Sequence, residues 1–165
     1  MHNSIVHDLI MQVRLWDMAR QHSQLDLDAQ ICFPLYAATR AVTRAYAQLL
    51  DEVGLTYPQY LTMLALWGAD EPMTVGELGD RLRLDSGTLT PLLKRLEAAG
   101  HVVRRRDASD ERRVLLEVTE EGWQLRDRVA HVPGALLRLL SMNADDGKEL
   151  RRLLKELLEN LDAVE

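Results

Sequence analysis

The sequence predicts a mainly α-helical domain that carries one small β-hairpin. Apolar residues recur at helical spacing through most of the chain, whereas residues 101–119 change to the two-residue period of strands. At 165 residues, with 47% hydrophobic and 28% charged side chains, the chain has the size and composition of one globular domain. It contains no run of about 18 apolar residues and no secretion-signal pattern, so we expect a cytoplasmic protein without a membrane segment.

Two helices are expected in the first half of the chain. The first begins near Cys32, with Pro34 in its first turn, and ends before Gly54, which suits a left-handed helix cap. The second is opened by Thr56, Tyr57 and Pro58, with Pro58 in its first turn, and is closed by Gly68. Its apolar side is predicted to consist of Leu61, Leu64 and Trp67.

Two shorter helices and a hairpin are expected next. Thr74 with Glu77 three residues later forms a capping box, which predicts a helix start. A further helix over residues 86–99 turns one apolar stripe inward, formed by Leu89, Leu92, Leu93 and Leu96. Residues 102–118 predict two strands joined by a charged loop, because apolar and polar residues alternate on either side of a polar turn.

The C-terminal part is predicted to be helical. Thr119, followed by two glutamates, caps a long helix with a bend at Pro133 and Gly134. A last helix from about Asp145 carries a wide apolar stripe of Leu150, Leu153, Leu154, Leu157, Leu158 and Leu161. In a domain of this size the stripe favours packing against a second subunit, although packing within the chain stays open.

Helix, tight turn, helix and a hairpin with a basic tip follow one another in the order of a winged helix-turn-helix, a DNA-binding fold. Although the net charge of the chain is −6, residues 81–113 contain nine basic and five acidic side chains. This local excess of positive charge can neutralise DNA phosphates. On the predicted recognition helix, six residues face outward, and we expect them to approach bases and phosphates: Ser86, Thr88, Thr90, Pro91, Lys94 and Arg95. We expect the wing to contribute Arg104, Arg105, Arg106, Asp110 and Arg112. Asp110 is predicted to pair with Arg112 across the loop, so that another arginine enters the minor groove.

Cys32 is the only cysteine of the chain, and the five histidines lack metal-ligand spacing, so we expect no intrachain disulfide, metal site or other cofactor. Its predicted place at a helix start indicates a reactive group, because free backbone donors and the helix dipole favour a thiolate there. The alternative is a small buried hydrophobe, since free cysteines among apolar neighbours usually pack.

Four segments carry a family resemblance. The wing segment DERRVLLEVT (residues 110–119) resembles the D-x-R-(x6)-T signature of the MarR family of winged-helix regulators. The segments QICFPLY (30–36), LTYPQY (55–60) and LDSGTLTPLLKR (84–95) are similar to the organic-hydroperoxide-sensing branch of that family, OhrR. The resemblance covers about residues 25–163, and it implies a single domain over 25–165 that follows an N-terminal extension over 1–24. Within that domain it implies a winged helix-turn-helix at about 56–119 and dimerisation helices at about 28–54 and 119–163.

The resemblance also implies a function. The chain is expected to be a homodimeric repressor that binds a pseudo-palindromic operator in double-stranded DNA and releases it when an organic hydroperoxide oxidises Cys32. Tyrosines of the partner subunit, by position Tyr46 and Tyr57, are implied to hydrogen-bond the thiolate, with Tyr36 in the same pocket. Some members of this branch carry a second, resolving cysteine, which this chain lacks. Its oxidised thiol must therefore react otherwise, either with a low-molecular-weight thiol or with more oxidant.

Three alternative functions stay open at this point. The same fold could instead sense a small phenolic or aromatic ligand with Cys32 as packing, and salicylate-like compounds would distinguish that case from hydroperoxide sensing. A thiol peroxidase is the enzymatic alternative, but the pattern P-x-x-x-T-x-x-C is absent, with Ala29 in the threonine position, so we expect no enzyme. A helical adaptor is the weakest alternative, because it leaves the charged wing unexplained.

Overall fold

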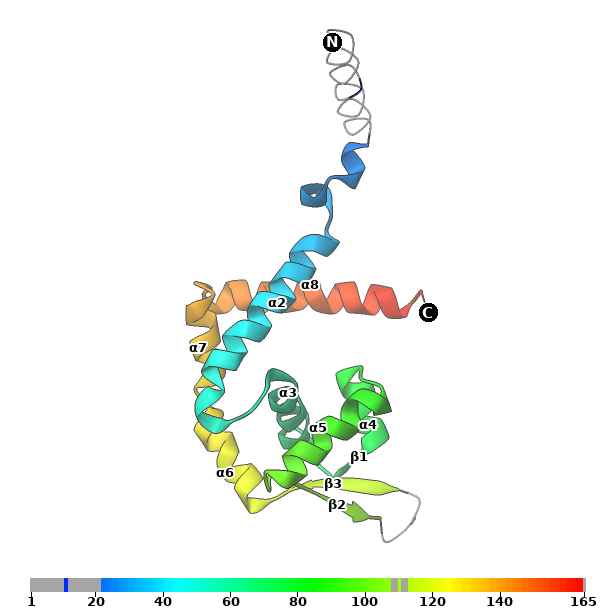
Figure 1. Cartoon of the computed structure of the whole chain (residues 1–165), viewed down its shortest axis with the longest axis vertical. Coiled ribbons are helices and arrows are strands. Elements are labelled where there is room, and N and C mark those ends of the chain that lie inside the picture. Colours follow the sequence, from blue (N-terminus) through cyan, green and yellow to red (C-terminus); the bar gives the residue numbers. More distant parts are fainter. Residues whose placement is uncertain (1–10, 12–21, 108–109, 111–112, 165) are drawn as a thin grey trace, which may run out of the picture. The chain divides into compact units, whose positions relative to one another are not determined.

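The computed structural model of the chain describes Met11 and residues 22–107, 110 and 113–164. The chain divides into two units after Val42, and each is described by itself. The first unit contains two short 3-10 turns, Ser23–Leu25 and Leu27–Ala29, and the first part of helix α2 (Cys32–Leu49) (Figure 1). The predicted start at Cys32 and the place of Pro34 in the first turn are confirmed. All of α2 is described, and none of its side chains is buried.

The second unit begins within α2 and continues through a left-handed turn into α3 (Tyr57–Trp67). Helix α2 ends at Leu49, before the predicted end near Gly54, and a separate 3-10 turn, Asp51–Val53, follows it. Gly54 ends this turn at φ 68°, the left-handed conformation that the sequence predicts. Thr56 then starts α3 with a capping box, since its backbone N–H donates to Gln59 Oε1 at 2.7 Å.

The buried face of α3 differs from the predicted one. Leu64 is 42% exposed and Leu61 is half-buried, whereas Tyr60 and Met63 are almost completely buried. The helix packs against α4 (Val75–Leu82), α5 (Ser86–Ala98) and α6 (Glu120–Val129), so these neighbours decide which side is covered. The prediction was right for Trp67, which is 7% exposed.

A three-stranded antiparallel sheet lies beside α3, α4 and α5 (Figure 1). The predicted hairpin consists of β2 (Val102–Arg106) and β3 (Val114–Val118), and a third strand that the sequence did not predict, β1 (Met73–Thr74), pairs with the other edge of β3. Thr74 lies opposite Leu115 in this register. Because Thr74 is also the N-cap of α4, the hairpin is connected directly to the start of that helix.

The helix-turn-helix consists of α4 and α5. Thr74 and Asp85 cap the two helices, and their side chains accept the backbone N–H groups of Glu77 and Thr88. The predicted inward stripe of α5 is confirmed, since these side chains are all buried: Leu89, Leu92, Leu93 and Leu96.

The C-terminal part contains α6, α7 (Val132–Leu139) and α8 (Ala144–Asp162). Thr119 caps α6 as predicted, and the predicted bend is a break between α6 and α7 at residues 130–131. Five leucines of α8 are 37–56% exposed: Leu150, Leu153, Leu154, Leu158 and Leu161. The bidentate ion pair of Arg83 with Asp162, at 2.5 and 2.6 Å, connects the turn before α5 to the end of α8. No helix in the described ranges is both long and apolar enough to cross a membrane.

Gly122 marks the tightest contact between α6 and the hairpin. A Cβ atom at this position would lie 2.2 Å from the carbonyl oxygen of His101 and 2.7 Å from Cγ1 of Val118. The Gly122 carbonyl also accepts the indole N–H of the buried Trp67 at 3.0 Å. A side chain here would therefore force the first turn of α6 away from the sheet.

We expect Gly122→Ala to lower the free energy of unfolding by at least about 2 kcal/mol, because overpacking against backbone cannot relax by a rotamer change. Chemical denaturation at a fixed protomer concentration, followed by tryptophan fluorescence, measures this change. Gly76→Ala is the control, since its Cβ would meet only Thr74 Oγ1 at 3.9 Å. Equal stability of the two variants would contradict the prediction.

Candidate functional site

The outward face of α5 is polar and exposed, as predicted. The exposed side chains are Ser86, Thr88, Thr90, Pro91, Lys94 and Arg95. Asp85 fixes the start of this face, because it accepts the backbone N–H of Thr88 at 2.9 Å and the Thr88 hydroxyl at 3.0 Å. These hydrogen bonds hold the pKa of Asp85 below its usual value, so the cap stays charged at neutral pH.

Two of the three consecutive arginines of β2 are held by carboxylates of the same chain. Arg104 Nε lies 3.1 Å from Glu97 of α5, and Arg105 Nε lies 3.0 Å from Glu117 of β3. Arg104 is half-buried beside its partner, whereas Arg105 and Arg106 are exposed. The three arginines, which the sequence suggested as equivalent DNA contacts, therefore occupy different environments, and Arg104 is the least accessible of them.

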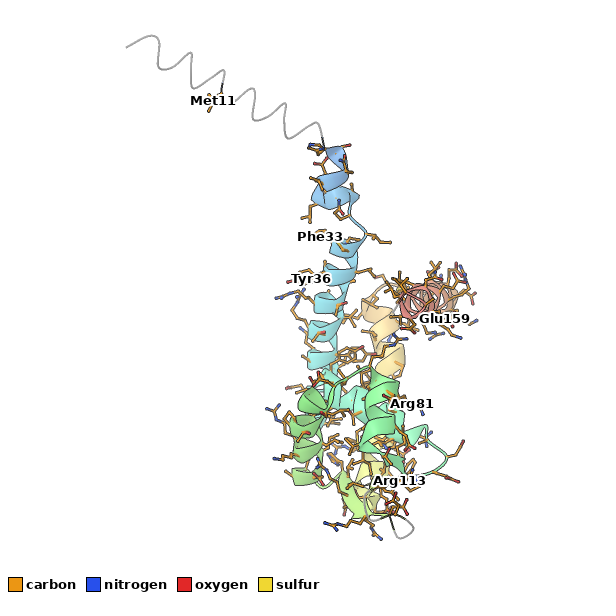
Figure 2. The ribbon with its side chains drawn as sticks, turned by 90° about the vertical axis from the view of Figure 1, so that its right-hand side faces the viewer. Met11, Phe33, Tyr36, Arg81, Arg113 and Glu159 are labelled. Atoms are coloured by element: carbon orange, nitrogen blue, oxygen red, sulfur yellow. The ribbon has the colours of Figure 1, made fainter. Side chains whose placement is uncertain are left out.

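The base of the wing loop is organised by Arg113. Its guanidinium lies 3.5 Å from Glu77 of α4 and 3.6 Å from Asp107, and its backbone N–H donates to the Asp110 carbonyl at 2.9 Å. Figure 2 shows Arg113 at the hairpin end of the molecule. Arg112, the predicted partner of Asp110, lies outside the described residues, so that pairing stays a prediction.

Cys32 is exposed at the first position of α2. Apolar neighbours on the same segment are exposed as well: Ile31 at 74%, Tyr36 at 60% and Phe33 at 37%. Figure 2 shows Phe33 and Tyr36 projecting from the first half of the helix. Within its unit the thiol is therefore open to a reagent, which the buried-hydrophobe alternative does not predict.

Three tyrosines form a cluster between the end of α2 and the start of α3. The rings of Tyr46 and Tyr57 stack with centroids 4.1 Å apart, and Tyr60, which the sequence did not suggest, lies 5.6 Å from Tyr46. Burial, together with the neighbouring phenols, raises the pKa of Tyr46 to about 12, and burial also raises the pKa values of Tyr57 and Tyr60. All three hydroxyls therefore stay protonated, and able to donate, far above neutral pH.

Tyr36, the third tyrosine suggested for the sensor pocket, has a different local partner. Its hydroxyl accepts a hydrogen bond from Arg40 at 3.1 Å, one helical turn later, and the guanidinium lies 5.6 Å from the ring centroid. Sequence reasoning missed Arg40 as well as Tyr60, although each follows a suggested tyrosine at a spacing of one helical turn. Among the described side chains, no group of three or more histidine, cysteine or acidic residues is placed to hold a metal ion.

Comparison with known proteins identifies the family. The family described as transcriptional regulator SarA/Rot matches residues 44–129. The chain is 44% identical over 144 residues to the organic hydroperoxide resistance transcriptional regulator of Bacillus subtilis, covering 87% of this chain and 97% of that protein.

Solved structures agree with this relationship. Reduced AbfR bound to DNA is similar with a TM-score of 0.70 and 35% identity, over 86% of this chain and 98% of that one. AbfR, a protein of Staphylococcus epidermidis, has also been seen overoxidized and bound to DNA. MarR itself is similar with a TM-score of 0.65 and 26% identity, over 78% of this chain and 95% of that one. The chain belongs to the MarR family of winged-helix transcriptional regulators, in the branch of the organic hydroperoxide resistance regulators.

Proposed function

We propose that this protein is a transcriptional repressor that binds operator DNA through α5 and the wing and releases it when an organic hydroperoxide oxidises Cys32. The observation that carries the proposal is that one chain presents both an exposed thiol at a helix start and an exposed polar face on α5. The DNA-bound structures of AbfR and the name of the Bacillus relative support the same two activities.

The chemistry begins with attack of the Cys32 thiolate on the peroxide. The sulfur bonds to the terminal oxygen, the O–O bond breaks, and the alkoxide takes up a proton to leave as an alcohol, which gives Cys32 sulfenic acid. A low-molecular-weight thiol then displaces water from the sulfenic acid and forms a mixed disulfide. Without that thiol, more oxidant drives the sulfur to sulfinic and sulfonic acids, which cannot be reduced by ordinary thiols.

In this proposal the protein acts as a homodimer, joined through helices at about 28–54 and 119–163, and each thiolate is stabilised by tyrosines of the other subunit. Fourteen residues of continuous helix separate Cys32 from Tyr46, a rise of about 21 Å, which exceeds the reach of a hydrogen bond within one chain. Tyr46 and Tyr57, whose stacked rings carry protonated hydroxyls, provide suitable donors for the thiolate of a partner chain.

We expect Tyr57→Phe to slow the oxidation of Cys32 by about tenfold at neutral pH, since a hydrogen bond to a charged group is worth about 1.5–3 kcal/mol. The loss of free thiol with time in cumene hydroperoxide, followed by intact mass, measures this rate. Tyr60→Phe is the matched control, because it removes a hydroxyl from the same cluster at a position not proposed to donate. Equal rates in both variants would show that the rings only pack.

A DNA-release assay tests the whole proposal. A duplex selected by the wild-type protein from a random library is bound, and cumene hydroperoxide is added with or without free cysteine. We expect partial or slow release by peroxide alone, and full release, reversible by dithiothreitol, when cysteine is present. The overoxidized AbfR bound to DNA supports this expectation, since added oxygen atoms do not by themselves exclude DNA binding in that relative.

Two results would overturn the proposed mechanism. One is a Cys32-to-Cys32 disulfide as the main product on a non-reducing gel, and the other is rapid, complete release before any thiol adduct forms. Failure to select any duplex would overturn DNA recognition itself.

A second candidate, release by a small phenolic or aromatic ligand, is favoured by one observation. A cavity of about 250 Å³ lies between α3 and α6, lined by Tyr60, Leu64, Trp67, Gly68, Arg126, Val129, Ala130 and Pro133. Its aromatic walls and single guanidinium suit an aromatic anion. Release of the selected duplex by salicylate from a Cys32→Ser protein would establish this function instead.

A further inference from the structure

The contact between Glu77 and Arg113 joins the first turn of α4 to the residue that precedes β3. Glu77 lies one turn into α4, three residues after its cap Thr74, and Arg113 lies two residues before Leu115, the strand partner of Thr74. The sheet register thus brings the two side chains to the same place, with Arg113 Nη2 3.5 Å from Glu77 Oε1. A hollow of about 580 Å³ lies at this junction, bordered by Thr74, Val75, Gly76, Glu77, Arg113 and Val114.

Arg113 is held from two sides. Its other terminal nitrogen, Nη1, lies 3.6 Å from Asp107, which directly follows β2, and the Asp107 backbone N–H donates to the Arg113 carbonyl at 3.0 Å. Hydrogen bonds from the Thr74 amide and hydroxyl lower the pKa of Glu77, and Arg113 lowers it further, so this carboxylate is charged at any physiological pH. The guanidinium therefore bridges the end of the hairpin and the start of α4.

We propose that Arg113 is a positioning residue for operator selectivity: through Glu77 and Asp107 it fixes the angle of the wing relative to the helix-turn-helix. The inference rests on the proposed DNA-binding function. Pairing of β1 with β3 at Leu115 and Leu116 fixes the base of the hairpin beside α4, and Arg113 lies beyond that pairing, toward the loop. There the ion pairs limit how far the loop end of the hairpin can tilt. A wing at a fixed angle meets DNA in one register, whereas a wing that tilts accepts many registers and many sequences.

Glu77→Gln isolates this contact. Glutamine at the third helix position also accepts the N-cap N–H of a capping box, so the start of α4 is retained while the charge facing Arg113 is lost. Glu71→Gln is the matched control, since it removes an identical charge from an exposed position on the loop after α3. Arg113→Gln removes the other partner, and the double variant tests whether the two act together.

The experiment measures dissociation constants for two duplexes in one buffer, one selected by the wild-type protein from a random library and one scrambled duplex of equal composition. An exposed ion pair is typically worth about threefold in an equilibrium constant, and the factors of the two wings in a dimer multiply to roughly tenfold. We expect Glu77→Gln to lower the ratio of the affinity for the selected duplex to the affinity for the scrambled duplex by this factor. Arg113→Gln should lower that ratio at least as far. The double variant should show no loss beyond Arg113→Gln, and Glu71→Gln should keep the wild-type ratio.

The opposite pattern identifies Arg113 as a plain phosphate contact and overturns the proposal. In that case Arg113→Gln weakens binding to both duplexes equally, and Glu77→Gln, like Glu71→Gln, tightens both because negative charge has been removed. A wild-type protein that shows no preference for any selected duplex refutes the proposed function, whereas a wild-type preference that survives Glu77→Gln refutes only this inference.

Discussion

Cys32→Ser is expected to bind the selected duplex with wild-type affinity and to remain bound in cumene hydroperoxide with added cysteine. Serine fills nearly the same volume at an exposed helix start, so neither the fold nor the face of α5 should change. The hydroxyl cannot be oxidised by the peroxide, and the response should therefore be lost completely rather than reduced. Fluorescence anisotropy of the labelled duplex, before and after oxidation, measures both parts of the prediction.

Oxidation of an exposed methionine is a competing explanation for a peroxide effect, and a variant of Met11 tests it at that position. Met11 is 52% exposed, which makes it an accessible thioether. Met11→Leu should release DNA as the wild-type protein does. Release from the Cys32→Ser protein would show that another residue senses the oxidant.

Leu154→Asp is expected to abolish dimerisation and, with it, tight binding to a pseudo-palindromic site. Leu154 lies within the exposed leucine stripe of α8. Burying each such side chain stabilises an interface by about 1.5–3 kcal/mol, and a two-fold dimer contains every substitution twice. Replacing both copies by a buried carboxylate should raise the dimer dissociation constant by at least about a thousandfold.

Sedimentation velocity measures the oligomeric state, and the anisotropy assay measures the consequence for DNA. Asn160→Asp is the matched control, because it adds the same charge to α8 at an exposed position outside the leucine stripe. A Leu154→Asp protein that stays dimeric would mean that α8 does not form the interface.

Local sequence signals predicted most elements of the fold correctly. The leucine stripe of α5, the caps at Thr74 and Thr119 and the left-handed Gly54 follow from spacing and residue type alone, because each depends on neighbours within one or two turns. The buried side of α3 could not be predicted from spacing, because this helix is apolar on several sides. The packing of α4, α5 and α6 decides which of these sides is covered. Strand β1 was missed because two residues show no periodicity.

The sequence predicted only part of the candidate site. Tyr46 and Tyr57, suggested by family resemblance, do lie together. Tyr60 was not suggested, although it follows Tyr57 by one helical turn and belongs to the same cluster. The partners of the wing arginines were not predictable, because Glu77 lies 36 residues before Arg113 in the sequence and reaches it only through the sheet register. The roles of the α5 face and of Cys32 remain predictions for the experiments above.

The ion pairs of the wing also bear on how binding responds to ionic strength. Each phosphate neutralised by a cation releases counterions and contributes about −0.9 to the slope of log affinity against log salt concentration. Of the eight basic residues that the structure describes between positions 81 and 113, these four face carboxylates of their own chain: Arg83, Arg104, Arg105 and Arg113. If these arginines keep their carboxylate partners when the protein is bound to DNA, they neutralise few phosphates and therefore release few counterions. The regulator should then hold its operator over a wider range of ionic strength than its count of arginines and lysines suggests.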